Sequence, residues 1–455
     1  MSSPSTSESV TVIGAGLAGS EAAWQLAVRG IPVNLIEMRP VTPSPAHHTG
    51  ALAELVCSNS FKSLDPATAP GMLKREMQAL GSLIVAAAHA TAVPAGAALA
   101  VDRDAFAELI TRVIEGHPLI ALERREATAI PEGDVILATG PLTSSGIEDA
   151  LSALLGKDRL AFFDAAAPIV SADSVDLSVA FRASRYDKGE GADYINCPLT
   201  RESYDAFLEA LLSAERVIPK AFEQKDLFQA CQPIEEIARC GPDALRFGAM
   251  KPVGLIDPAT GERPWAVLQL RAENRALTAY NLVGCQTNLT FPEQRRVFSM
   301  IPGLRFADFL RYGVMHRNTF VDAPRLLAHD LSVRTDPRVR IAGQLSGTEG
   351  YLEAAAGGIV AALGIIDARE GTSSLPLPAD TALGSLIAYA TDPETVRYQP
   401  MHVNIGIMPA MPSVRSKRVR RAAIGDRAAA AIDSYLAANA GMLAPARREA
   451  ERIIR

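Results

Sequence analysis

The residues whose types and spacing most clearly indicate chemistry lie in a glycine-rich turn near the N-terminus. The turn follows a β-branched run at 10–13 and precedes a helix predicted at 20–29. Small residues let the backbone of such a turn approach a pyrophosphate, because unpaired N–H groups at the start of the helix face the anion. The pattern predicts a dinucleotide-binding turn formed by Gly14, Ala15, Gly16, Leu17, Ala18 and Gly19.

An acidic residue stands at the distance that this kind of site requires. A second apolar strand, predicted at 32–36, delivers Glu37 at its carboxyl end, 18 residues after Gly19. A carboxylate in this place accepts hydrogen bonds from the hydroxyl groups of an adenosine ribose. Together with the turn, these elements predict a Rossmann-type βαβ unit that binds a dinucleotide.

Two later turns favour FAD over a nicotinamide cofactor. A buried strand predicted at 134–138 ends in a small turn, and a strand at 339–342 enters a second glycine-rich turn before a helix of small residues at 351–363. In flavoproteins with two dinucleotide-binding domains, turns of these two kinds flank the FAD. We therefore add a further set of residues to the predicted cofactor site: Thr139, Gly140, Gly343, Gln344, Gly350 and Tyr351.

The positions of these motifs predict a discontinuous domain. The expected fold class is α/β, with a Rossmann-like FAD-binding domain of the two-dinucleotide-binding-domain type formed by residues 8–150 and 326–455. Residues 151–325 are expected to form an inserted α+β domain that binds the substrate. A chain of 455 residues is long enough for two large units of this kind.

Composition excludes several classes of protein. The chain carries 45 Lys plus Arg against 51 Asp plus Glu, a net charge of −6, so it is not a uniformly cationic nucleic-acid binder. The first nine residues lack the apolar core of a secretory signal, and the alanine-rich tract at 85–101 is too interrupted for a membrane span.

The five cysteines, at positions 57, 197, 231, 240 and 285, show no CxxC pair and no zinc spacing. We expect reduced thiols, no metal site and a cytoplasmic protein.

Longer blocks of sequence resemble the TrmFO family of folate- and FAD-dependent tRNA uracil-5-methyltransferases. The resemblance covers nearly the whole chain, and its blocks are distributed from residue 37 to residue 351. It also implies that Arg39 belongs to the cofactor site. The blocks lie at 37–40, 53–62, 230–235, 245–248, 251–255, 286–289, 311–319 and 343–351.

The resemblance implies two catalytic cysteines. Carbon 5 of uracil becomes a nucleophile only after a thiolate adds at carbon 6, and a second group must then remove the proton on carbon 5. Cys57 and Cys231 match the family's catalytic positions, with Cys231 preferred as the nucleophile and Cys57 as the proton acceptor. The sequence leaves the exchange of these roles open. The implied cofactors are FAD, 5,10-methylenetetrahydrofolate and NADH or NADPH.

The implied substrate is the uridine at position 54 in the T loop of tRNA, with no membrane and no obligate protein partner. Alternatives are a GidA-like modifier of the tRNA wobble uridine, a ribosomal-RNA uridine modifier, an NAD(P)H flavin oxidoreductase and a non-catalytic flavin-binding RNA chaperone. The cationic run at 415–421 is either an RNA contact or a solvated helix face. Further side chains have no assigned role and could be loop, folate or phosphate contacts: His47, His48, His316, Arg271, Arg295 and Arg296.

Overall fold

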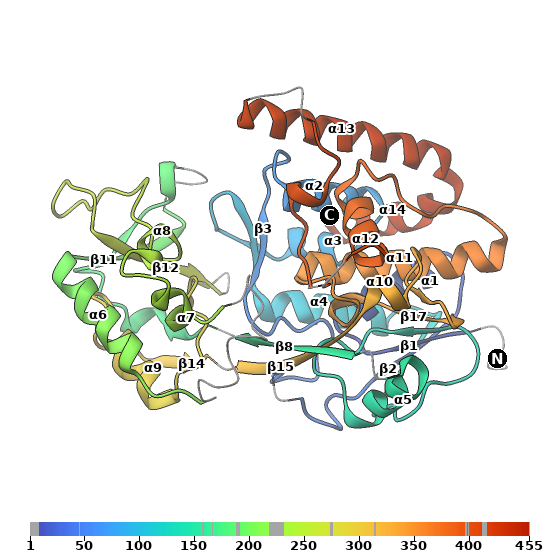
Figure 1. Ribbon diagram of the computed structural model, residues 1–455, viewed down its shortest axis with the longest axis horizontal. Helices are drawn as coiled ribbons and strands as arrows, with labels where there is room; N and C mark the ends of the chain where they lie inside the picture. The colour runs from blue at the N-terminus through green and yellow to red at the C-terminus, as the bar shows by residue number, and fades with distance from the viewer. Residues whose placement is uncertain are drawn as a thin grey trace.

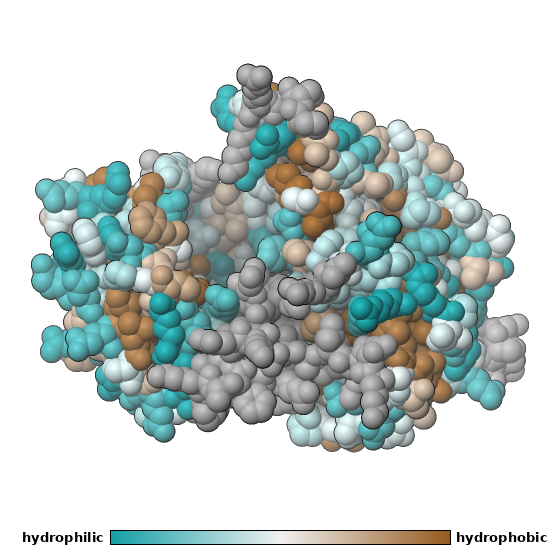
Figure 2. Space-filling view, viewed as in Figure 1, coloured by the Kyte–Doolittle hydropathy of each residue, from teal (hydrophilic) through white to brown (hydrophobic). Residues whose placement is uncertain are grey.

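The computed structural model describes residues 9–44, 46–156, 159–165, 167–187, 192–217, 232–273, 276–313, 315–395, 398, 400–411 and 416–454. Figure 1 shows two domains beside each other, and the larger one combines segments from both ends of the chain. The smaller domain contains the middle of the chain. Figure 2 shows hydrophilic side chains over much of the surface of both domains, with separate hydrophobic patches between them.

A six-stranded sheet forms the centre of the larger domain. Its order is β16-β17-β7-β1-β2-β6, and the pairs from β17 to β6 are parallel, whereas β16 is antiparallel to β17. The apolar residues of these strands are buried on both faces, as a parallel sheet between layers requires. The strands are β1 Val10–Ile13, β2 Val33–Glu37, β6 Ile120–Arg124, β7 Val135–Leu137, β16 Ser332–Val333 and β17 Asp336–Ile341.

Two buried helices pack closely against each other beside this sheet. They are α1 (Leu17–Ala27) and α11 (Tyr351–Glu370), which begin at the two glycine-rich turns. A Cβ atom at Gly358 would lie 2.2 Å from the carbonyl oxygen of Ala18, so only glycine allows this approach. Among the described residues, α11 is the one helix long and apolar enough to span a membrane, and most of it is buried in the core.

Further elements surround these helices. Figure 1 shows α13 lying across the top of the larger domain. A three-stranded sheet of order β3-β5-β4 stands beside them. The bounds are β3 Ser60–Ser63, β4 Ala92–Val93, β5 Ala98–Val101, α2 Ala69–Ala79, α3 Leu83–Ala90, α4 Arg103–Glu115, α5 Ser145–Leu155, α10 Ala323–Leu326, α12 Ala382–Thr391, α13 Lys417–Ala438 and α14 Ala440–Ile454.

The smaller domain has its own sheet and its own apolar core. The sheet order is β10-β11-β12-β13-β9-β14, and all its pairs are antiparallel. Its elements are β9 Ile169–Ser171, β10 Phe181–Arg182, β11 Tyr194–Leu199, β12 Ala266–Ala272, β13 Ala279–Leu282, β14 Phe309–Arg311, α6 Arg201–Ser213, α7 Ile234–Arg239, α8 Ala244–Phe247 and α9 Phe291–Phe298.

Two antiparallel strands, β8 (Arg159–Ala165) and β15 (Met315–Val321), join the two domains. The domain limits at 150 and 326 remain a prediction. Leu151 and Phe320 both pack in the core of the larger domain, so α5 and the end of β15 belong to that core.

Candidate active site

A cavity lies where the carboxyl ends of β1, β2, β7 and β17 meet, the edge at which parallel sheets of this kind bind ligands. Segments far apart in the sequence line it, including both glycine-rich turns and the small turn after β7. The predicted cofactor residues that line the cavity are Gly14, Gly16, Leu17, Ala18, Glu37, Arg39, Thr139, Gly140, Gly343, Gln344 and Tyr351.

The other three predicted cofactor residues shape the turns around the cavity and are not part of its lining. Gly19 packs so tightly that a Cβ atom would lie 1.7 Å from the carbonyl oxygen of Gly14. Gly350 has φ of +113° and precedes α11, a conformation that favours glycine. Ala15 donates its backbone N–H to Glu37 over 2.8 Å.

Glu37 is buried at the end of β2 and remains ionised. One carboxylate oxygen accepts the N–H of Ala15, and the other accepts the backbone N–H and the Nε–H of Arg39. Burial raises the pKa of Glu37, but the Arg39 charge and these hydrogen bonds outweigh burial and lower it below its usual value. The carboxylate is thus fixed at the cavity wall, as a ribose acceptor requires.

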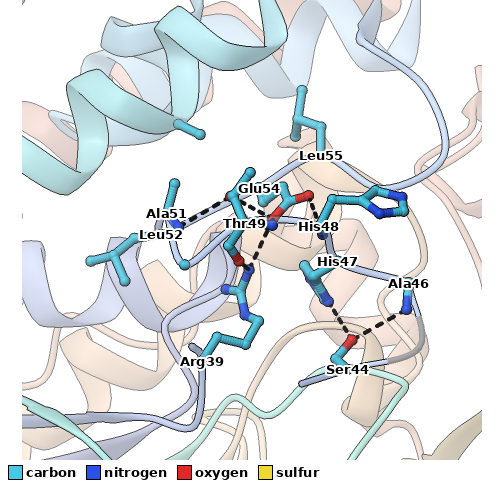
Figure 3. A network of polar contacts seen from close by, with 12 residues as sticks. Arg39, Ser44, Ala46, His47, His48, Thr49, Ala51, Leu52, Glu54 and Leu55 are labelled. Carbon is cyan, nitrogen blue, oxygen red and sulfur yellow. Dashed lines mark hydrogen bonds and ion pairs between the residues drawn. The ribbon is translucent and has the colours of Figure 1, made fainter. Parts of the chain in front are cut away.

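Arg39 also contacts the loop at 44–55, and Figure 3 shows it next to Glu54 of that loop. It forms ion pairs with Glu37 over 2.9 Å and with Glu54 over 3.2 Å. Glu54 also accepts the backbone N–H groups of His48 and Thr49 and the hydroxyl of Thr49. Sequence reasoning did not assign Glu54, because its importance depends on a loop conformation with no periodic signal.

The histidines of this loop differ in their surroundings. Nδ1 of His47 lies 2.6 Å from Oγ of Ser44, and His47 lines the cavity. Burial, followed by the charge of Arg39, lowers the pKa of His47 to about 4, so the ring is neutral at physiological pH. His48 is exposed and contributes its backbone N–H to Glu54. His316 lies on β15, and its side chain is outside the described part of the structure.

Cys57 lies in the loop before β3 and contacts the start of α11. Its Sγ atom is 3.1 Å from the hydroxyl oxygen of Tyr351, which also accepts the backbone N–H groups of Cys57 and Ser58 over 2.9 and 3.0 Å. Burial and the nearby thiol hold the pKa of Tyr351 well above its usual value. Because Tyr351 also lines the cavity, the structure brings the predicted catalytic thiol to the predicted cofactor site across 294 residues of sequence.

Cys231 lies outside the described residues. The segment that follows it is anchored in the smaller domain, where the N–H of Ile234 bonds to the carbonyl of Gln286 and Glu235 accepts the hydroxyl of Thr287. Of the remaining cysteines, Cys197 and Cys285 are fully buried and Cys240 is exposed. Burial raises the pKa of Cys197 to about 12 and also raises that of Cys285, as expected for structural thiols.

The arginines left unassigned by sequence fall into two groups. Arg271 is buried in β12. It donates hydrogen bonds to Ser58 and Asn59, the two residues that follow Cys57 in the loop. Arg295 is exposed, and Arg296 pairs with Glu293 on the surface of α9. Arg103, at the start of α4, donates a hydrogen bond to the carbonyl of Leu55 in the loop that contains Cys57. The sequence did not indicate this contact, because α4 meets the loop only in the folded chain.

Known proteins resemble this chain over most of its length. The model of the family described as glucose inhibited division protein A matches residues 9–372. The methylenetetrahydrofolate-tRNA-(uracil-5-)-methyltransferase TrmFO of Heliobacterium modesticaldum is 54% identical over 432 residues, covering 94% of this chain and 98% of the relative. The protein of the same name from Geobacter sulfurreducens is 52% identical over 429 residues, covering 94% and 99%.

The solved structure of Aquifex aeolicus GidA shares the fold. It superposes with a TM-score of 0.69 at 18% identity, covering 99% of this chain and 76% of the GidA chain. This confirms the predicted fold class of a flavoprotein-like α/β domain with an insertion.

Proposed function

The chain belongs to the TrmFO family of methylenetetrahydrofolate-tRNA-(uracil-5-)-methyltransferases, and from this premise we propose that it forms 5-methyluridine at position 54 in the T loop of tRNA. The reaction uses FAD, 5,10-methylenetetrahydrofolate as the one-carbon donor and NADH or NADPH as the reductant. Its partners are tRNA and folate, and we place it in the cytoplasm without an obligate protein partner.

The residues of the cavity fit FAD. The residues at 14 and 16–18 line the cavity at the start of α1, where a helix has unpaired N–H groups that suit a pyrophosphate, and the ionised Glu37 supplies a ribose acceptor. A Cβ atom at Gly16 would meet no protein atom within 4 Å, so the glycine leaves room there for a ligand. When bound, FAD supplies the carrier of the one-carbon unit and the reducing equivalents.

The contact between Cys57 and Tyr351 carries the proposal. It places a half-buried thiol beside a residue that lines the cofactor cavity. In this position Cys57 accepts the proton from carbon 5 of the uracil ring, after a thiolate has added at carbon 6. We assign that nucleophile to Cys231, following the family resemblance.

Methyl transfer to RNA tests the function directly. With labelled methylenetetrahydrofolate and NADH or NADPH, the flavin-bound protein should label a tRNA T-arm that contains the position-54 uridine, because carbon 5 receives the folate-derived carbon. An RNA with cytidine at this position is the matched control and should stay unlabelled. Labelling from S-adenosylmethionine instead, or no labelling of the uridine RNA, would contradict the proposal.

The same assay separates the alternative enzymes. A GidA-like modifier would label an anticodon arm with its wobble uridine, and a ribosomal modifier would label a ribosomal fragment but not the T-arm. A flavin oxidoreductase would consume NAD(P)H at a rate that RNA does not change. The proposed function requires labelling of the T-arm and an RNA-dependent reaction.

The cationic run at 415–421 includes the first turn of α13, and this turn is the candidate RNA contact. The first residue of α13 buried in the core is Ile424, so the arginines at 418, 420 and 421 precede the packed part of the helix. Figure 1 shows this end of α13 on the side of the larger domain that faces the smaller one. Arg415, the start of the cationic run, lies outside the described residues.

Neutralising this turn should weaken RNA binding. A variant with Arg418→Gln, Arg420→Gln and Arg421→Gln should lose roughly tenfold or more in tRNA affinity at moderate salt, because cationic side chains that contact phosphates release counterions. The slope of log affinity against log salt should fall by about 2 to 3. Filter binding across a salt series measures both quantities.

Three arginines of α14 give a control with the same change in charge. The variant with Arg447→Gln, Arg448→Gln and Arg452→Gln should keep the affinity and the salt slope of the wild type. If the α13 variant and the wild type bind tRNA with equal affinity, this turn is a solvated helix face and not an RNA contact.

A further inference from the structure

Three arginines from separate elements hold the loop on both sides of Cys57. Arg311 of β14 donates from Nη2 to the carbonyl of Val56 over 2.7 Å, and Arg103 at the start of α4 donates to the carbonyl of Leu55. Arg271 of β12 donates to Oδ1 of Asn59 over 2.8 Å and to Oγ of Ser58 over 2.9 Å. We call Arg103, Arg271 and Arg311 the arginine cradle.

The arginine cradle carries more positive charge than its carboxylate partner neutralises. Within the described part of the chain, the one carboxylate that pairs with any of the three is Glu273, which lies 2.7 Å from Arg103. Arg271 is 7% exposed, and the side chains of Arg103 and Glu273 are 13% and 5% exposed. Guanidinium groups stay protonated in proteins, so a mostly buried site holds three cations and one anion.

Such an excess of buried charge is costly unless a further anion lies nearby. Burial lowers the pKa of Arg311, and the neighbouring charge of Arg103 lowers it further, whereas Tyr351, Glu273 and Cys57 act in the opposite direction. Burial also lowers the pKa of Arg103, but the Glu273 carboxylate outweighs burial and raises it overall, with Cys57 contributing in the same sense. The thiol therefore lies within electrostatic reach of Arg103 and Arg311.

The hydrogen bonds of Tyr351 favour the same charge state. A phenol oxygen has two acceptor positions and one proton. Both acceptor positions of Tyr351 are taken by the N–H groups of Cys57 and Ser58. The proton of the hydroxyl is therefore the one shared with Sγ, and the sulfur accepts it over 3.1 Å.

We infer that the arginine cradle, together with the Tyr351 hydroxyl, holds Cys57 as a thiolate at neutral pH, with its three arginines acting as positioning residues. The charged groups packed against the Cys57 loop are Arg103 from α4, Arg271 from β12, Glu273 after β12 and Arg311 from β14, and the neutral Tyr351 hydroxyl comes from α11. Of the arginines, Arg103 and Arg311 are the two that interact electrostatically with the thiol itself. On its own loop, Glu54 is already paired with Arg39.

This inference rests on the proposed function, because it explains how Cys57 acts as the proton acceptor. A thiolate takes the proton of carbon 5 directly and becomes a thiol, while the electron pair of the C–H bond moves into the ring as an enolate. This enolate would expel the group that delivered the one-carbon unit and leave a methylene on carbon 5. A hydride equivalent derived from NADH or NADPH would then convert the methylene to the methyl group, and the C5–C6 double bond forms as carbon 6 expels the Cys231 thiolate. The released Cys231 thiolate then starts the next cycle. The thiol of Cys57 returns its proton to solvent.

Alkylation of single cysteines reads the charge state without methyl transfer. The full-length flavin-bound protein is treated with iodoacetamide across a pH series, and each cysteine peptide is quantified by mass spectrometry. Thiolates react and thiols do not, so the rate follows the thiolate fraction. Cys57 should react at a pH about one unit or more below that of exposed Cys240, which serves as the internal reference.

Arg311→Met is the most informative variant, because it removes one positive charge from the arginine cradle without leaving a carboxylate unpaired in the described part of the chain. The pH midpoint of Cys57 alkylation should rise by about one unit, which is roughly tenfold slower alkylation below the midpoint. Arg311→Lys retains the charge and should restore most of the rate. Arg305→Met makes the same change on an exposed residue six positions earlier and should leave Cys57 unchanged.

Glu273→Gln tests the sign of the effect. Removing the one paired carboxylate makes the site more positive, so the Cys57 midpoint should fall, opposite to Arg311→Met. Loss of loop structure alone would move both variants in the same direction. A shift of both variants in the same direction would overturn the inference. So would an unshifted midpoint in Arg311→Met, or an equal shift in Arg305→Met. A wild-type Cys57 that reacts no more readily than Cys240 would also overturn it.

The two proposals fail separately. If Cys57 behaves as expected here but Cys57→Ala still methylates tRNA, the arginine cradle stands and the catalytic role of Cys57 falls. If methylation requires Cys57 but its alkylation follows that of Cys240, the role stands and the arginine cradle falls.

Discussion

Replacing Gly16 with valine should give a folded protein that carries no flavin. Gly16 lines the cavity with an ordinary negative φ of −71°, and an added Cβ would meet no protein atom within 4 Å. A side chain that begins at this open position would extend into the space of the ligand at the start of α1. Flavin absorbance per mole of protein should fall by about tenfold or more, because a pyrophosphate needs close approach to this backbone.

Gly441→Val is the matched control. Gly441 also has room for a Cβ atom, but it is exposed on α14 and is not part of the cavity lining. This variant should retain full flavin content, and both variants should show the circular dichroism of the wild type. By contrast, a side chain at Gly19 would collide with the Gly14 carbonyl, so its loss of flavin would not separate binding from folding. Full flavin content in Gly16→Val would show that the cofactor lies elsewhere.

The position of the glycine-rich turn in the fold could be predicted because its requirements are local. Gly14, Gly16 and Glu37 are set by one βαβ unit, whose backbone geometry fixes where small and acidic residues must stand. The limits of the elements were less accurate. The helix predicted from 20 begins at Leu17, because the turn glycines lead directly into it, and the helix predicted to end at 363 continues to Glu370.

The surroundings of Cys57 could not be predicted, because they depend on tertiary contacts. Tyr351 reaches the thiol from the start of a helix 294 residues away, and Arg311 reaches the loop from an edge strand of the other domain. No period or spacing in the sequence encodes such a contact. The block at 311–319 and the block at 53–62 drew attention to both segments, but only the fold shows that they touch.

Cys57→Ala and Cys231→Ala should each reduce methylation by at least about a hundredfold while leaving a flavin-bound protein. Removal of a positioned acid–base group typically costs two to four orders of magnitude, and the ring is not activated without a nucleophile. Alanine at 57 keeps the backbone N–H bond to Tyr351, and the bonds of Arg271 to Ser58 and Asn59 still hold the loop. Labelled methyl transfer to the T-arm measures the loss, and Cys240→Ala should behave as the wild type.

An RNA that contains 5-fluorouridine at the target position should separate the two roles. Fluorine cannot leave carbon 5 as a cation, so a thiolate that adds at carbon 6 stays in a covalent protein–RNA complex that gel electrophoresis detects. If Cys231 is the nucleophile, Cys231→Ala forms no complex, whereas Cys57→Ala still forms one because addition precedes proton removal. A complex in Cys231→Ala but none in Cys57→Ala would exchange the two assignments. In that case the arginine cradle would serve a nucleophile instead of a base, since a thiolate at Cys57 suits either step.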